Sequence, residues 1–472
     1  MDKKKRTSFL SLLAILIVAS LVWNISAPSG LSDQAWHMLI LFIFTIFTII
    51  AKPLPMGAVA LIAMTLSILT GTIKTNDAFS GFSQSVVWFV MVALFIAEGF
   101  KVTGLGRRIG LFFTAILGKK TLGLSYGLLA TDLILAPLIP SVTGRVAGIV
   151  YPILQGIADS FKSLPNSDSA KKMGQFLMLT TFQGTVITSA MFLTAMAANP
   201  MLAELAGAQK LPITMGSWAL AGIVPGLINL LLMPLVIYFF CPPEIKNTPE
   251  ATVFARTQLK KMGAMKRSEW LLLGTLMLVL FLWIFGKQLN VDNAVAALLG
   301  VSLLLIFQVM NWDEILKLTM AWETFIWYAV LIVFASQLSS LGVIDWVAKH
   351  VEVLFFGYDW KISFPLLALL YFYIHYFFAS STAHIAAFFS PFLIIALGLG
   401  TPPYLALFVL IFSSNLFGGL THYSLSPAPL LFGVGYVPIK TWWFIGFVIS
   451  VLNIVVWFSI GPLWWKLVGL IQ

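Results

Sequence analysis

Long apolar segments separated by short polar breaks dominate the sequence, and this pattern limits the possible folds more than any other feature. Only 10% of the 472 residues are charged, whereas a soluble globular domain carries roughly 25%. Apolar residues make up 60% of the chain, and a helix that crosses a bilayer needs about 20 of them in succession. The pattern excludes a soluble enzyme and a disordered chain, and it predicts an all-α polytopic membrane protein with about 11 transmembrane helices.

The predicted spans are the apolar runs of sufficient length. They cover residues 9–24, 37–51, 53–72, 85–101, 175–195 and 217–240, followed by 270–286, 292–309, 325–341, 403–430 and 440–465. The first run follows a basic stretch, as in a signal peptide, but it lacks a convincing cleavage site, so we expect a retained span. Cys241 is the single cysteine, which excludes an intramolecular disulfide. No metal, no cofactor and no catalytic residue is predicted.

The basic residues predict the orientation of the chain. They outnumber the acidic ones by 28 to 18 and gather in the polar breaks, where they orient the chain against the membrane and give no reason to expect a nucleic-acid partner. The longest break, residues 242–269, is rich in lysine and arginine and is therefore predicted to be cytoplasmic. The six spans before it place the N-terminus in the cytoplasm as well.

Two segments do not fit simple spans. Residues 122–159 and 364–400 are mostly apolar, but polar residues interrupt each of them near its middle. Such interruptions survive at membrane depth only when they are buried in protein or line a wet cavity. We expect each segment to be a re-entrant hairpin with a polar tip.

The two halves of the chain resemble each other. A shift of 239 residues lays Ser141, Thr143 and Arg145 on Ser380, Thr382 and His384, and a shift of 238 pairs Gly104 with Gly342. The predicted domains are an N-terminal span and linker (1–36), a first repeat (37–241), a cytoplasmic linker (242–269) and a second repeat (270–472). Five spans per repeat would invert the second repeat relative to the first, and inverted repeats with interrupted segments are typical of secondary transporters.

The chemistry of the two tips indicates an anion. The hydroxyl groups of Ser141, Thr143, Ser380 and Thr382 can donate hydrogen bonds, and so can the backbone N–H groups that begin the helix after each tip. Serine and threonine in membrane helices also bond to their own backbone or to neighbouring helices. The duplication at repeat-related positions favours the binding role.

Arg145 and His384 suggest that the anion carries two charges. A charged residue deep in the bilayer costs at least about 2.5 to 3.5 kcal/mol, so it is rarely found there without a function. The alternative for Arg145 is a structural ion pair with Asp132 or Glu98, and the alternative for His384 is a packing role.

Each half contains a second weak point after its hairpin, at residues 194–200 and 418–427. Glycine and proline in these apolar segments permit unwound backbone that faces a cavity, with Thr194 and Thr421 as the expected contacts. A simple kink or loop is the alternative, above all for the first segment. We interpret residues 103–118, with Arg107 and Arg108, as an interfacial helix, and residues 343–357 as its counterpart.

These paired tips, the Gly104-Leu-Gly-Arg-Arg-Ile stretch, the Phe378-Ala-Ser-Ser-Thr-Ala-His run and the Thr421 loop resemble the divalent anion:sodium symporter (DASS, or INDY) family. The resemblance implies a homodimer in which each protomer has a scaffold domain and a moving transport domain, with an elevator-type mechanism. The family's tips read Ser-Asn-Thr and serve the substrate carboxylates. Here Val142 and Ser381 replace the asparagines.

In this departure from the motif, the chain resembles the exchanger branch of the family. That branch includes bacterial citrate:succinate antiporters and plastid 2-oxoglutarate/malate translocators. Sodium-coupled relatives commonly continue with a small residue and a threonine, whereas this chain has Arg145 and His384. We expect these two cations to compensate the ligand's charge in place of sodium. An empty carrier would then hold uncompensated charge and cross the membrane poorly, which would make exchange obligatory.

The sequence therefore predicts a transporter of the cell membrane that exchanges di- or tricarboxylates such as 2-oxoglutarate, malate, succinate or citrate without sodium. A sodium- or proton-coupled symporter is the first alternative. An integral-membrane enzyme is the second, although no acid/base cluster or nucleophile motif supports it.

Overall fold

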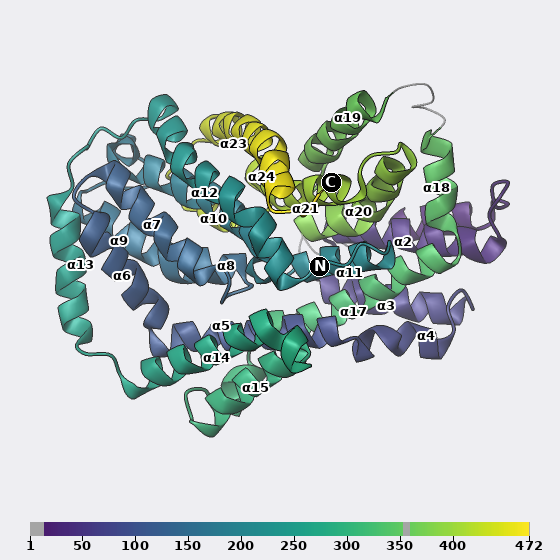
Figure 1. Cartoon of the computed structure of the whole chain (residues 1–472), viewed down its shortest axis with the longest axis horizontal. Coiled ribbons are helices and arrows are strands. Elements are labelled where there is room, and N and C mark those ends of the chain that lie inside the picture. The colour runs from purple at the N-terminus through teal and green to yellow at the C-terminus, as the bar shows by residue number, and fades with distance from the viewer. Residues whose placement is uncertain (1–13, 353–358, 472) are drawn as a thin grey trace.

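The computed structural model describes residues 14–352 and 359–471. Helices and the loops between them form this part of the chain (Figure 1). The predicted all-α polytopic fold is confirmed.

The helices of the first half are α2 (Asp33–Ala51), α3 (Met56–Leu69), α4 (Thr75–Phe79), α5 (Ser85–Thr103), α6 (Leu105–Leu117), α7 (Thr121–Leu135), α8 (Val142–Arg145), α9 (Tyr151–Ser160), α10 (Gly174–Met191), α11 (Asn199–Ala208) and α12 (Met215–Phe240). The linker holds α13 (Pro249–Met262). The second half holds α14 (Arg267–Leu289), α15 (Asn293–Ile306), α16 (Trp312–Leu316), α17 (Thr319–Ser340), α18 (Val343–Glu352), α19 (Trp360–Tyr373), α20 (Ser381–Gly398), α21 (Pro403–Leu416), α22 (Ala428–Gly433), α23 (Ile439–Val455) and α24 (Gly461–Leu467).

Apolar helices account for most of the predicted spans. Helix α10, at the predicted span 175–195, is not among the helices that are long and apolar enough to cross a membrane, whereas α20, in the predicted re-entrant hairpin 364–400, is. Within the described residues, seven helices are long and apolar enough to cross a membrane, and shorter apolar helices include Ala14–Trp23, α3 and α15. The predicted span 9–24 begins in a stretch that lies outside the described residues. The predicted span 403–430 is broken at its expected weak point, because α21 ends at Leu416 and the chain unwinds before α22.

The two halves repeat the same order of elements. In each half a long helix ends at a glycine with positive φ, Gly104 (φ 79°) after α5 and Gly342 (φ 73°) after α17. Glycine reaches this conformation without a steric penalty, so the chain turns there into a separate amphipathic helix, α6 or α18. The helices predicted over 103–118 and 343–357 are therefore present, although residues 353–357 of the second prediction lie outside the described part of the chain.

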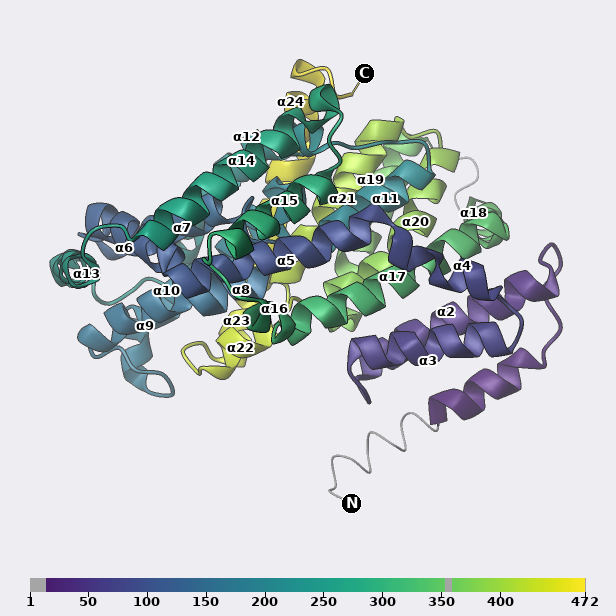
Figure 2. The same cartoon turned by 90° about the horizontal axis from the view of Figure 1, so that it is seen from below.

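The helices pack in two groups. The central bundle comprises α2, α3, α5, α14, α15 and α17; α5 packs on α15 and α17, and α17 packs on α3 (Figure 2). The hairpin bundle comprises α7 to α12 and α19 to α24, in which α10 packs on α7, α12 and α21. Helices α6 and α18 connect the two bundles in sequence, and α20 of the second hairpin packs on α2 and α18.

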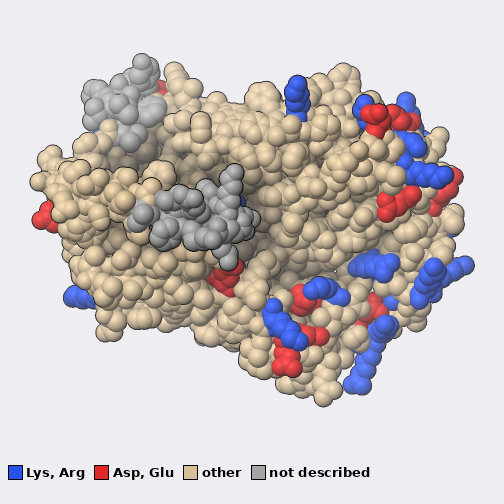
Figure 3. All heavy atoms as spheres, turned by 180° about the vertical axis from the view of Figure 1, so that it is seen from behind, with Lys and Arg blue, Asp and Glu red and all other residues tan. Residues whose placement is uncertain are grey.

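The linker is fastened to the first half. Arg108 on α6 forms a bidentate ion pair with Glu269 (2.6 Å for Nε to Oε1) and donates to the carbonyl oxygen of Gly263 (2.8 Å). Figure 3 shows that charged side chains gather mainly at one end of the visible face, the end where α13 lies, while most of that face is uncharged.

Candidate anion-binding site

The two hairpin tips have the same local geometry. Ser141 precedes α8 and Ser380 precedes α20, and each serine caps its helix. The Ser141 hydroxyl oxygen accepts from the N–H of Gly144 (3.0 Å), and the Ser380 oxygen accepts from the N–H of Ala383 (3.3 Å). A hydroxyl group has one hydrogen to donate besides its lone pairs. Capping therefore uses the oxygen and leaves the O–H of each serine free to donate to a ligand.

Both tips line one cavity of about 290 Å³. Segments far apart in sequence meet here: the first tip, the second tip, the start of α17, the unwound stretch before α11 and the turn before α22. The lining residues are Lys52, Met56, Leu94, Pro140, Ser141, Val142, Thr143, Met196, Ala197, Ala198, Met320, Thr324, Trp327, Ala379, Ser380, Ser381, Thr382, Leu425 and Ser426. The volume is near the lower end of the range for small-molecule sites.

The charge of this lining is positive. Within the described part of the chain, Lys52 is its one charged residue, and neither aspartate nor glutamate is among the lining residues. The first N–H groups of a helix also carry partial positive charge and lack intrahelical partners, and α8 and α20 both begin at the cavity. The arrangement can hold a small anion through hydroxyl groups, backbone N–H groups and one ammonium group.

The other predicted tip residues differ in how far they are engaged. Thr143 donates to the hydroxyl oxygen of Ser426 (3.0 Å), and Ser381 donates to the carbonyl oxygen of Ser424 (2.8 Å). Val142 lines the cavity as a buried apolar contact. Thr382 also lines it and is partly exposed. Thr382 and the two capping serines are thus the hydroxyl donors most available to a ligand.

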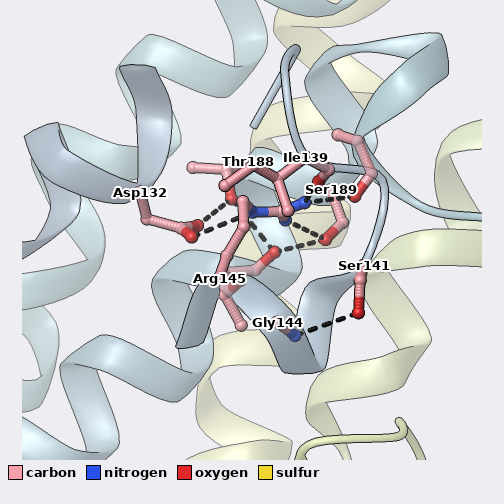
Figure 4. A network of polar contacts seen from close by, with 9 residues as sticks. Asp132, Ile139, Ser141, Gly144, Arg145, Thr188 and Ser189 are labelled. Atoms are coloured by element: carbon pink, nitrogen blue, oxygen red, sulfur yellow. Dashed lines mark hydrogen bonds and ion pairs between the residues drawn. The ribbon is translucent and has the colours of Figure 1, made fainter. Parts of the chain in front are cut away.

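Arg145 lies behind the first tip and is completely buried (Figure 4). Its Nε donates to Asp132 on α7 (3.0 Å), and Nη2 donates to Ser189 on α10 (3.1 Å). Nη1 donates to two carbonyl oxygens, those of Ile139 (2.6 Å) and Ala195 (2.5 Å). One guanidinium group thereby joins both arms of the hairpin to α10 and to the unwound segment that follows it.

The expectation that Arg145 holds an uncompensated charge is wrong. Asp132 pairs with it, and Thr188 donates to the second carboxylate oxygen of Asp132. The structural alternative is therefore the arrangement found, with Asp132 as the partner; Glu98 pairs with Lys101 instead (2.8 Å). Arg145 is not among the cavity-lining residues, so in this conformation it supports the tip from behind.

His384 also lies behind its tip, outside the cavity lining. It is fully buried, with its ring stacked on Phe417 at 4.4 Å between centroids. Its Nδ1 lies 3.0 Å from Nδ1 of His375, whose Nε2 lies 3.0 Å from the carbonyl oxygen of Ser424. A carbonyl only accepts, so His375 donates there and shares one proton with His384 on its other side. The packing role is the one that the contacts support.

The weak points after the hairpins are unwound, but the predicted threonines do not line the cavity. Thr194 donates to the carbonyl oxygen of Pro137 (2.8 Å), which ties its segment to the first hairpin. Thr421 is buried, and its hydroxyl oxygen accepts from the N–H of Tyr423 (3.4 Å). Residues a few positions further along, at 196–198 and 425–426, line the cavity instead.

Sequence reasoning missed Lys52, Thr324 and Ser426. Lys52 follows α2 in a short polar break that looks like an ordinary membrane boundary. The sequence holds one signal for Lys52: the repeat-related position is Asn290, so the lysine is specific to the first half. Nothing in the sequence, however, brings residue 52 next to residue 379.

Comparisons with known proteins identify the family of the chain. Residues 6–471 match the family described as the sodium:sulfate symporter transmembrane region. The chain belongs to this family. It is the divalent anion:sodium symporter family that the hairpin motifs resemble.

Several relatives cover nearly the whole chain. A putative malate transporter, YflS, of Bacillus subtilis is 48% identical over 99% of this chain and 98% of its own. The chloroplastic dicarboxylate transporter 1 of Spinacia oleracea is 46% identical over 97% of this chain and 81% of its own. The citrate/succinate antiporter of Escherichia coli is 35% identical over 95% of this chain and 96% of its own. The family and these relatives are transporters and not enzymes, so the enzyme alternative is not supported.

A solved structure shares the fold. The YdaH transporter of Alcanivorax borkumensis matches with a TM-score of 0.51 over 99% of both chains at 14% identity. At this identity the match supports the polytopic membrane fold alone.

Proposed function

We propose that this protein exchanges di- or tricarboxylates such as 2-oxoglutarate, malate, succinate or citrate across the cell membrane, and that the cavity between the hairpin tips binds them. The observation that carries the proposal is that both tips line one cavity whose only charged lining residue, among the residues that the structure describes, is a lysine. Relatives named for malate, dicarboxylates and citrate/succinate support the substrate class.

Sodium independence is supported by the contacts of Arg145. Sodium prefers oxygen ligands, and the carbonyl groups of unwound segments supply them in many transporters. In this chain the Arg145 guanidinium already donates to such carbonyls, at Ile139 and Ala195. Arg145 therefore occupies carbonyl oxygens that could otherwise coordinate sodium, and Asp132 neutralises its charge.

The proposed mode of transport is an elevator in a homodimer. The central bundle is the scaffold, and the hairpin bundle carries the substrate as a unit, because its internal packing joins both hairpins to α10 and α21. The N-terminus and the linker lie in the cytoplasm, as the basic residues of the linker favour.

A counterflow experiment tests the proposal. Proteoliposomes preloaded with succinate, malate, citrate or buffer receive labelled 2-oxoglutarate, with and without sodium. We expect uptake only into vesicles that hold a carboxylate, and the same rate in choline as in sodium.

The symporter alternative gives the opposite pattern. Uptake into empty vesicles that requires an inward sodium or proton gradient would overturn the exchange proposal. Vesicles without protein set the background in each condition.

A further inference from the structure

Lys52 is held at the cavity by rigid backbone. It ends α2 in the left-handed conformation (φ 50°), and its N–H donates to the carbonyl oxygen of Thr48 (3.1 Å). Pro53 and Pro55 follow, and proline fixes φ. The turn therefore presents the lysine side chain at a fixed place on the central bundle.

The Lys52 side chain reaches across to the other bundle. Its Nζ lies 3.5 Å from the carbonyl oxygen of Ala379, to which it donates, and Ala379 immediately precedes the capping serine of the second tip. Lys52 is exposed, so the cavity meets the surface here. An ammonium group with one long hydrogen bond can turn to a carboxylate that enters the cavity, which it would bind more strongly.

The opposite end of the central bundle has a second cavity, of about 480 Å³. It occupies the repeat-related place, because Ser85 and Ala294 line it where Thr324 and Met56 line the first cavity. Ser85 pairs with Thr324 at the repeat shift of 239, and Met56 pairs with Ala294 at the shift of 238. The second cavity is lined by Glu204 and Asp292.

The counterpart of Lys52 itself is neutral. Asn290 ends α14 in the same left-handed conformation (φ 56°), with its N–H bonded to the carbonyl oxygen of Gly286. The repeat thus keeps the turn and changes the side chain. One opening has a lysine at this turn, and the other has carboxylates in its lining.

We propose that Lys52 is a binding residue for the dianion at one face of the membrane only, which makes the carrier bind dicarboxylates more tightly at that face. This rests on the proposed function, since Lys52 belongs to the scaffold and stays behind when the hairpin bundle moves. The tip hydroxyls serve the substrate at both faces, whereas the lysine serves it at one.

Lys52 lies at the membrane face that carries the linker (242–269). Helix α6 begins just after α5 ends and is bonded through Arg108 to Gly263 and Glu269, so the end of α5 lies on the linker side. Helices α3 and α5 run back and forth in succession before that point. The end of α2, at Lys52, is therefore on the same side.

The test measures exchange from each face separately. Two preparations of proteoliposomes are used, one with the linker outside and one with the linker inside, as assigned by protease access to the linker. Each preparation is preloaded with malate, and external malate is titrated. In Lys52→Gln we expect the half-saturating concentration at the linker face to rise about fivefold, the upper end of the range for an exposed ion pair. At the opposite face we expect no change.

Two variants control for charge and folding. Lys52→Arg keeps the cation and should restore tight binding at the linker face. Lys317→Gln removes an exposed scaffold lysine that does not line the cavity, three residues before the lining residue Met320, and should leave both faces as in the wild type.

The outcomes separate the two proposals. An unchanged half-saturating concentration at the linker face, or an equal rise at both faces, overturns the role of Lys52 while the exchange proposal stands. A wild type that exchanges no dicarboxylate from either face overturns the proposed function, and the Lys52 inference with it.

Discussion

The tips of the two hairpins have the same local geometry, but different residues support them. Ser141 and Ser380 cap their helices in the same way and line the same cavity. Behind the first tip lies a buried ion pair, and behind the second lies a cluster of aromatic rings. The shape of a tip thus does not depend on one kind of support.

The supporting residues nevertheless occupy matching positions. The repeat shift of 239 lays Asp132 on Tyr371 and Arg145 on His384. Arg145 and Asp132 form an ion pair, while Tyr371 and His384 pack edge to face at 4.8 Å between ring centroids. Positions that touch in one half also touch in the other, although the chemistry has changed. The shared tip therefore says more about ligand binding than the residue behind it does.

The largest difference between the hairpins should appear in stability. Arg145→Ala leaves Asp132 buried without a partner, and breaking a buried ion pair costs about 3 to 5 kcal/mol. His384→Phe keeps the ring stacking and removes one hydrogen bond, worth about 0.5 to 1.5 kcal/mol. Unfolding of the ligand-free proteins in detergent measures both values.

A double variant separates support from ligand binding. Asp132→Leu added to Arg145→Met removes both charges and should recover much of the lost stability. If Arg145→Ala unfolds like the wild type and only loses affinity for dicarboxylates, Arg145 is a ligand and the comparison of the two supports fails.

A smaller difference should appear in binding. Thr382→Val removes a hydroxyl that lines the cavity, and a hydrogen bond to a charged group is worth about 1.5 to 3 kcal/mol, so affinity should fall roughly tenfold or more. Thr143 must first release Ser426, so Thr143→Val should cost less. Calorimetric titration with malate compares the two variants.

The matched control is Thr65→Val on α3. Thr65 is exposed, bonds to its own helix at the carbonyl oxygen of Leu61 (2.8 Å) and does not line the cavity. Its affinity should equal that of the wild type. If all three variants bind malate with the affinity of the wild type, the tip threonines do not bind the ligand.

The sequence predicts most of the fold and part of the site, for reasons that particular residues make clear. Ser141 and Ser380 could be found because the same polar residues interrupt both apolar segments, and a repeated interruption stands out against an apolar background. Gly104 and Gly342 could be paired because they match at a shift of 238 between the halves, and both have positive φ.

The remaining features depend on tertiary packing. The partner of Arg145 had two candidates, and only the approach of α7 to the tip selects Asp132 over Glu98. Thr194 lies in the correct segment, but the point at which the unwound chain faces the cavity is set by packing against α10 and the hairpin. Lys52 is 327 residues from Ala379 in the sequence, beyond the reach of any local pattern.

The most direct test of the central claim is protection of the cavity by substrate. Ser426→Cys in a Cys241→Ser background places a thiol at an exposed lining position, and Ser167→Cys places one on an exposed loop away from it. The rate of maleimide modification is measured with and without saturating malate. We expect malate to slow modification at position 426 and to leave position 167 unchanged. Equal rates at position 426 with and without malate, in protein that exchanges malate, would show that dicarboxylates bind elsewhere.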